Sequence, residues 1–101
     1  MSLHYFTDTV TRAVFRELAR LLMPGGLLAF QCKTVDDPQY GRGRKIEKDM
    51  YDSTHARHFF SEAYARECLQ SLFEVQSMRS ERGPLYNDDS AYVKVVARLH
   101  N

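Results

Sequence analysis

Cysteine is scarce in this sequence, with only Cys32 and Cys68 among 101 residues. The two are far apart in the chain and match no metal-binding spacing. A disulfide framework is therefore not expected. We predict two free thiols in a reducing compartment, which favours a cytoplasmic protein.

The sequence also lacks an excess of either charge and lacks long apolar runs. Fourteen Lys and Arg residues balance thirteen Asp and Glu residues, giving a formal charge of +1. No overall field favours a nucleic acid or an anionic membrane as a partner. The longest apolar run, 27–30, is far too short to cross a bilayer, so we expect a soluble protein. A basic cluster is interpreted as a solvated loop rather than a phosphate-binding patch: Arg42, Arg44, Lys45 and Lys48.

Glycine is infrequent, and none of the five glycines lies between a predicted strand and the helix that the strand would lead into. Gly41 and Gly43 resemble the start of a dinucleotide-binding loop. No strand precedes them, however, and no third glycine follows in register. We therefore predict no such loop in this chain.

A helix and a strand are predicted in the first third of the chain. Apolar side chains recur with helical spacing over residues 7–23, which predicts an amphipathic helix. Thr7 or Asp8 is expected to cap its first turn, and the Pro-Gly-Gly sequence at 24–26 is expected to end it. The apolar run over 27–33 is typical of a buried parallel strand with helices on both faces of its sheet. The polar segment that follows, 34–57, is too long for an ordinary connection and is interpreted as a lid-like loop or a mobile segment.

The last third of the chain predicts one more helix and two strands. Ser61 is the expected cap of a helix of about a dozen residues. Alternating apolar and polar residues from Phe73 onward predict a strand, and turn residues follow at 83–84 and 87–89. A last strand is predicted over 92–99 and is expected to pair antiparallel with the strand that begins at Phe73. The chain is thus predicted to form a single α/β domain.

The segment 20–30, RLLMPGGLLAF, resembles the part of class I S-adenosylmethionine-dependent methyltransferases in which a helix ends in a Pro-Gly-Gly turn and leads into the fifth strand. Residues 3–6 are similar to the segment that leaves the family's fourth strand and forms one wall of the cleft. Residues 57–61, the helix after them and the closing strand pair are similar to the end of the fold. The resemblance covers essentially all of 1–101, and it implies a partial Rossmann-like sheet, about half of the full fold.

The resemblance implies S-adenosylmethionine as the cofactor of the intact family. The half of the fold that carries the glycine-rich turn and the ribose-binding acidic residue has no counterpart here. We therefore expect no cofactor to bind this chain alone. The resemblance implies a C-terminal methyltransferase fragment that acts on a small-molecule acceptor in its intact form and is inactive by itself.

Six substrate-binding candidates follow from the resemblance, two in the wall of the cleft and four in the lid: His4 and Tyr5, then Tyr40, Glu47, Tyr51 and Arg57. A structural interpretation stays open beside this one. In it, His4 and Tyr5 are surface residues of a frayed N-terminus, and Tyr40 and Tyr51 hold the lid by packing. No catalytic residue is assigned.

Other reactive side chains have weaker patterns. His55 and His58, three residues apart, could share a helix face, but no third ligand is evident and no metal site is predicted. Cys68 lies on the apolar face of the second predicted helix, where a thiol usually packs without reacting.

Assembly is expected because the family's fourth strand, which would cover one edge of 27–33, is missing. We predict a homodimer through that edge. Two alternatives are a separate chain that supplies the cofactor-binding half, and a non-catalytic binding module that uses the lid for recognition.

Overall fold

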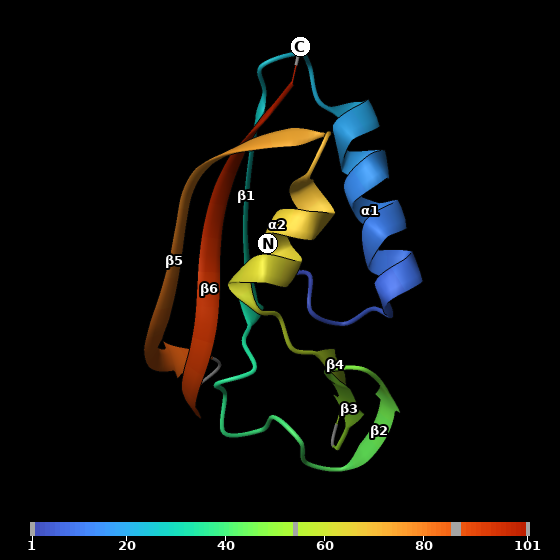
Figure 1. Ribbon diagram of the computed structural model, residues 1–101. Coiled ribbons are helices and arrows are strands. Elements are labelled where there is room, and N and C mark those ends of the chain that lie inside the picture. Colours follow the sequence, from blue (N-terminus) through green and yellow to red (C-terminus); the bar gives the residue numbers. More distant parts are fainter. Residues whose placement is uncertain (1, 54, 86–87, 101) are drawn as a thin grey trace.

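The computed structural model describes residues 2–53, 55–85 and 88–100, and within these ranges it contains two helices and two antiparallel sheets. The helices are α1 (Asp8–Leu21) and α2 (Glu62–Leu69). The larger sheet has the order β1 (Leu27–Lys33), β6 (Asp88–Leu99), β5 (Phe73–Leu85). The smaller sheet has the order β2 (Arg44–Glu47), β3 (Met50–Asp52), β4 (Ala56–His58), and it lies beyond the carboxyl end of β1 (Figure 1).

Both helices begin at the caps that the sequence predicts. The Thr7 hydroxyl accepts a hydrogen bond from the amide of Val10, and the Ser61 hydroxyl accepts one from the amide of Tyr64 at 3.0 Å. Helix α2 has eight residues rather than about twelve. It ends early because the chain turns at Ser71, which has a φ of 72°, to start β5.

The larger sheet is covered on one face only, so the prediction of a parallel strand buried on both faces is wrong for β1. Its alternate residues Leu28, Phe30 and Cys32 are buried, whereas Leu27 and Ala29 are exposed. Strand β1 pairs antiparallel with β6 and lies at the edge of the sheet. The buried residues alternate along the strand, so one covered face accounts for them, and the apolar Leu27 and Ala29 lie on the other face.

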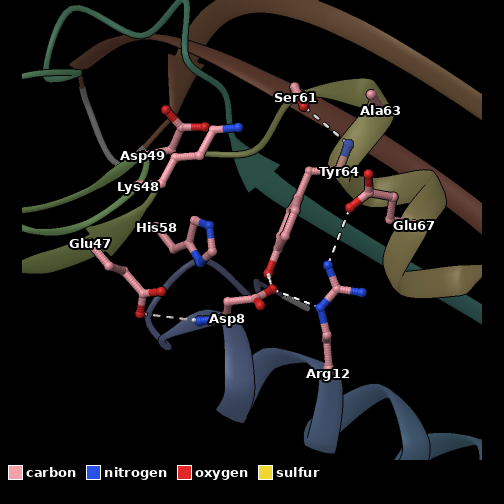
Figure 2. Close-up of a pocket in the computed structure, with 10 residues that line it drawn as sticks. All are labelled: Asp8, Arg12, Glu47, Lys48, Asp49, His58, Ser61, Ala63, Tyr64 and Glu67. Carbon is pink, nitrogen blue, oxygen red and sulfur yellow. Dashed lines mark hydrogen bonds and ion pairs between the residues drawn. The ribbon is translucent and has the colours of Figure 1, made fainter.

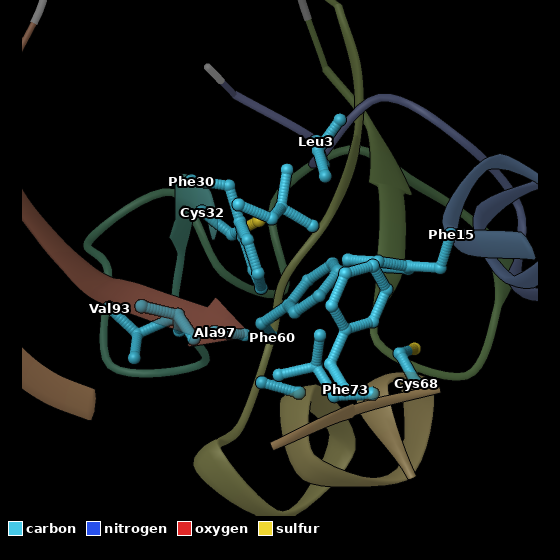
Figure 3. Packing of buried hydrophobic residues seen from close by; sticks show 13 residues of the cluster. Leu3, Phe15, Phe30, Cys32, Phe60, Cys68, Phe73, Val93 and Ala97 are labelled. Atoms are coloured by element: carbon cyan, nitrogen blue, oxygen red, sulfur yellow. The ribbon is translucent and has the colours of Figure 1, made fainter. Parts of the chain in front are cut away.

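The core fills the space between the covered face of this sheet and both helices (Figure 3). Phe15 of α1 meets Phe30 of β1 with ring centroids 5.1 Å apart. Phe60, just before α2, is fully buried in the same cluster. Cys32 and Cys68 also lie in this core as free thiols, and burial raises the pKa of Cys32 to about 12. The apolar face of α1 and the alternate residues of β1 therefore bury one another.

Strands β5 and β6 form a hairpin with the predicted antiparallel pairing. The turn predicted at 83–84 is wrong, because these residues continue β5 and pair with β6. Of the second turn signal, Asp88 and Asp89 belong to β6 and Asn87 lies outside the described residues. A bulge between Val75 and Ser77 shifts the alternation, so that Met78 packs against the core instead of Ser77.

The segment 34–57, interpreted from the sequence as a lid-like loop, contains the three strands of the smaller sheet, which is called the lid sheet below. Its geometry requires glycine at position 43. Gly43 has a φ of +82°, and a Cβ there would lie 2.2 Å from the carbonyl oxygen of Asp52. The short strands escape a sequence pattern because they bury few apolar side chains.

A buried ion pair fixes the start of the lid segment to the larger sheet. Lys33 Nζ lies 3.2 Å from Asp37 Oδ2, and the two side chains are 4% and 0% exposed. The same carboxylate oxygen accepts the amide of Ala91 at 3.0 Å, and Lys33 also donates to the hydroxyl of Ser90. The lid segment therefore leaves β1 in a fixed direction.

Candidate functional site

The N-terminal segment runs beside β1 in the same direction. Ser2 forms a parallel bridge with Gln31, and His4 Nδ1 accepts a hydrogen bond from the amide of Lys33 at 3.3 Å. The carbonyl of His4 accepts the amide of His58 at 2.8 Å. The end of the N-terminal segment, the carboxyl end of β1 and strand β4 therefore meet at one edge of the molecule.

His4 is fully buried at this edge, so the frayed-terminus interpretation is wrong for it. Burial, reinforced by the positive charges of Arg57 and Lys33, lowers the pKa of His4 from 6.5 to about 4. Its imidazole is therefore neutral at pH 7. Tyr5, in contrast, is 42% exposed, with its ring centroid 4.3 Å from that of His4.

Two of the four lid candidates pack against each other. The ring centroids of Tyr40 and Tyr51 are 5.3 Å apart, and Phe59 completes the cluster at 5.6 Å from Tyr40. The Tyr40 hydroxyl donates to Asp49 Oδ1 at 2.6 Å, which raises the pKa of Tyr40. Both tyrosines therefore hold the lid segment together.

Arg57 and Glu47 lie in different environments. Arg57 pairs with Tyr51 across the ladder, and its buried Nε has no hydrogen-bond partner among the described residues. It is adjacent in β4 to His58, whose amide donates to the carbonyl of His4, and its positive charge helps to lower the pKa of His4. Glu47 instead accepts the backbone amide of Asp8, at 3.3 Å, and belongs to a cleft on the helix side.

That cleft, of about 310 Å³, lies between the first turns of α1 and α2 and the turn from β2 to β3 (Figure 2). It is lined mainly by charged and polar side chains: Asp8, Arg12, Glu47, Lys48, Asp49, His58, Ser61, Ala63, Tyr64 and Glu67. Asp8 Oδ1 accepts both the Tyr64 hydroxyl at 2.6 Å and Arg12 Nε at 2.8 Å. Arg12 also donates to Glu67 Oε2 at 3.2 Å, so the network joins the two helices.

The network fixes the protonation of its members at pH 7. The Tyr64 hydrogen bond, together with Arg12, lowers the pKa of Asp8. Burial raises the pKa of Tyr64, and its hydrogen bond to Asp8 adds to that effect. Asp8 is therefore a carboxylate and Tyr64 a neutral phenol.

His58 forms the wall of the cleft beside Tyr64. Its ring centroid lies 4.7 Å from that of Tyr64, and its Nδ1 lies 3.0 Å from the carbonyl oxygen of Phe6. His55 and His58 do not share a helix face, since His58 belongs to β4. No cluster of three potential metal ligands is present in the part of the chain that the structure describes.

Most residues of this cleft were not among the sequence candidates; only Glu47 was. The one local signal is the spacing of Asp8 and Arg12, four residues apart on a helix. Tyr64 lies 56 residues from Asp8, and no pattern within a single sequence connects them.

Comparison with solved structures gives a match to a SAM-dependent methyltransferase from Methanosarcina mazei. The TM-score is 0.80 at 17% sequence identity, and the match covers 99% of this chain and 57% of that chain. The chain has part of a methyltransferase fold. The predicted fold class, a partial Rossmann-like sheet, is confirmed. No family model matches the sequence, and no match is found among curated proteins.

In open sheets of this class, ligands bind in the crevice outside the carboxyl ends of the strands. In this partial methyltransferase fold, His4 lies at that end of β1, its carbonyl accepts an amide of β4, the strand that carries Arg57, and the lid sheet lies beyond β1 (Figure 1). Among the described residues, no helix is long and apolar enough to span a membrane.

Proposed function

We propose that this chain is the acceptor-side part of an S-adenosylmethionine-dependent methyltransferase, which acts on a small molecule in its intact form and is inactive alone. The observation that carries the proposal is the parallel bridge between Ser2 and Gln31. It places the N-terminal segment beside β1, next to residues 3–6, which resemble the segment that leaves the family's fourth strand. The match in fold to a known methyltransferase supports the same assignment.

The described residues do not fit the cofactor by themselves. Gly25 and Gly26 follow α1, Gly41 and Gly43 precede β2, and Gly83 lies within β5. None of them opens a helix after a strand, which is the place where backbone amides approach such a cofactor. We propose that residues outside this sequence bind the cofactor, which would supply the methyl group.

The role of this chain is then to position the acceptor. Methyl transfer depends mainly on holding the acceptor atom in line with the methyl group. The exposed Tyr5 and Arg57 of β4 are the candidates to contact the acceptor, and His4 holds the N-terminal segment at the carboxyl end of β1. Tyr40 and Tyr51 shape the lid by packing.

Calorimetric titration of the 101-residue chain with S-adenosylmethionine and with its demethylated product tests this proposal. We expect no binding of either compound. Tight one-to-one binding by the isolated chain would contradict the proposal. A longer polypeptide that includes the sequence encoded upstream is expected to carry a glycine-rich turn and to bind the cofactor.

An assembled enzyme is the second candidate, and the position of β1 favours it. Strand β1 lies at the edge of the sheet, and over 27–30 its outer side pairs with no strand in the described residues. A second copy of the chain, or a separate cofactor-binding chain, would cover this edge. Mixing with such a chain would then restore cofactor binding.

A cytoplasmic location is part of the proposal. Two buried thiols that form no disulfide are typical of proteins in a reducing compartment. Fractionation of cells that express the native gene checks it, and recovery of the protein with secreted or membrane material would contradict it.

A further inference from the structure

One ring nitrogen of His58 is available in the cleft. Nδ1 lies 3.0 Å from the carbonyl oxygen of Phe6. Because a carbonyl oxygen only accepts hydrogen bonds, Nδ1 carries a proton, and in the neutral form of the ring Nε2 carries the lone pair. The side chain is only 3% exposed, yet its ring lines the cleft, and Nε2 has no hydrogen-bond partner among the described residues (Figure 2).

Several hydrogen-bond donors around the cleft are already used. The amide of Asp8 donates to Glu47, and the amides of Val10 and Tyr64 donate to the two helix caps. The Arg12 guanidinium donates to Asp8 and Glu67. These donors are not available to an anion that enters the cleft, in spite of the two helix N-termini.

The acceptors, by contrast, exceed the donors. Asp8 Oδ2 and Glu47 Oε2 take part in no hydrogen bond in the described part of the chain, although the other oxygen of each carboxylate does. Four carboxylates line the cleft against two cationic side chains: Asp8, Glu47, Asp49 and Glu67 against Arg12 and Lys48. A ligand that brings positive charge and N–H donors would match this lining.

We propose that this cleft binds a small organic amine, with His58 Nε2 and the carboxylates of Asp8 and Glu47 accepting hydrogen bonds from its nitrogen. A volume of about 310 Å³ suits a ligand of only a few heavy atoms beyond the amine. The site stands on the geometry of the cleft.

Long-range ¹H–¹⁵N spectra of the labelled 101-residue chain test the site directly. His58 is expected to show the tautomer protonated at Nδ1. Ethanolamine, dimethylethanolamine and putrescine are then titrated at constant pH and ionic strength, with acetate and ethylene glycol as controls. A saturable shift of the His58 resonances with at least one amine, and none with the controls, is expected. The opposite tautomer, an equal response to acetate, or no response to any amine would overturn the proposal.

Two variants test the named groups. His58→Asn retains an N–H that can reach the Phe6 carbonyl and removes Nε2, so amine affinity should fall at least tenfold. Glu47→Gln retains an acceptor for the Asp8 amide and removes one charge, so affinity should fall severalfold. His55→Asn, which changes an exposed histidine outside the cleft, is the matched control and should bind as the wild type does. Unchanged affinity in a folded His58→Asn or Glu47→Gln protein contradicts the proposal. If a variant does not fold, the tautomer and the amine titration of the wild-type chain decide whether the proposal holds.

Failure of this site and failure of the proposed function give different results. Amine binding by the chain alone requires no cofactor. If the chain binds amines but the longer polypeptide does not bind the cofactor, the site stands and the methyltransferase proposal fails. If that polypeptide methylates another compound while amines never bind, the methyltransferase proposal stands and this site fails.

Discussion

At the scale of single residues, the buried pair of Lys33 and Asp37 is the most consequential polar contact outside the cleft. Asp37 accepts hydrogen bonds from Lys33, Ala91 and Gln39, so its charge is compensated on several sides. Lys33→Met removes the cation and leaves the carboxylate buried. We expect a loss of about 3–5 kcal/mol in the free energy of unfolding, measured by urea denaturation.

A surface pair provides the control for this prediction. Arg44 and Asp52 lie 3.8 Å apart on the lid sheet, with both side chains well exposed. Arg44→Met should change the free energy of unfolding by less than about 1 kcal/mol. Equal effects of the two substitutions would show that the buried pair contributes no more than a surface contact.

His4 should make stability depend on pH. Its pKa falls from 6.5 to about 4 on folding, chiefly because the ring is buried. Between these values the unfolded chain binds a proton that the folded chain does not, so stability decreases as the pH falls from about 6.5 to about 4. The full contribution is about 3 kcal/mol.

Urea denaturation at a series of pH values measures this effect. Carboxylates titrate in the same pH range, so the contribution of His4 is the difference in stability between the wild type and a variant without this histidine. His4→Asn retains an acceptor for the Lys33 amide and does not titrate, so the curve of this variant should be flatter than that of the wild type. Identical slopes for the two proteins would exclude His4 as the source. Direct titration of the His4 ring by NMR should give the same pKa.

The individual residues that could be predicted are those with a local role. The sequence indicates Thr7 and Ser61 as helix caps because a cap needs only its own first turn. Nothing local predicts that His4 is buried, since its burial depends on contacts with residues of β1 and β4. The hydrogen-bond network that joins Asp8 to Tyr64 could not be predicted from the sequence either, because it forms only when the two helices pack together.

At the scale of elements, the lid sheet depends on one glycine. Gly43→Ala combines a positive φ with a Cβ only 2.2 Å from the carbonyl oxygen of Asp52. Gly41 has a similar φ of +81°, but nothing lies within 4 Å of its Cβ position. Gly41→Ala should therefore cost only the conformational strain of about 1–2 kcal/mol, whereas Gly43→Ala should open the pairing of β2 with β3.

Hydrogen exchange separates these two outcomes. In Gly43→Ala, amides of the lid sheet should lose protection while those of β6 retain it, because the core lies elsewhere. In Gly41→Ala, the protection of the lid sheet should largely remain. Equal protection patterns in the two variants would show that the close contact with Asp52 can relax.

The elements that the sequence predicts well are those with a strong apolar period. Helix α1 and strand β6 bury one face each, and their bounds agree with the pattern to within a few residues. The lid strands have three or four residues each, and only Met50 and His58 among these residues are buried, so their alternation carries little information. The bulge after Val75 is also absent from the pattern, because a single extra residue leaves the composition unchanged.

At the scale of the whole molecule, the β1 edge of the larger sheet offers a place where a strand can add. Lys33 donates its amide away from β6, to His4, whereas the carbonyl of Gly26 points toward β6 and accepts the amide of Leu99. Since backbone groups alternate along a strand, the amide of Ala29 points to the open side of β1. Leu27, 54% exposed, lies on the same strand. This edge is therefore suited to pairing with a second chain.

We predict a homodimer through this edge, detectable by light scattering coupled to size exclusion. Ala29→Pro removes the outward amide without breaking a hydrogen bond to β6, and proline is tolerated on edge strands, so the variant should remain folded and become monomeric. Ala29→Val changes the same exposed side chain, keeps the amide and should remain dimeric. A wild-type protein that is strictly monomeric at high concentration would contradict the prediction. A dimer that survives Ala29→Pro would have to use another surface, and the edge of β1 would then be left for a cofactor-binding partner.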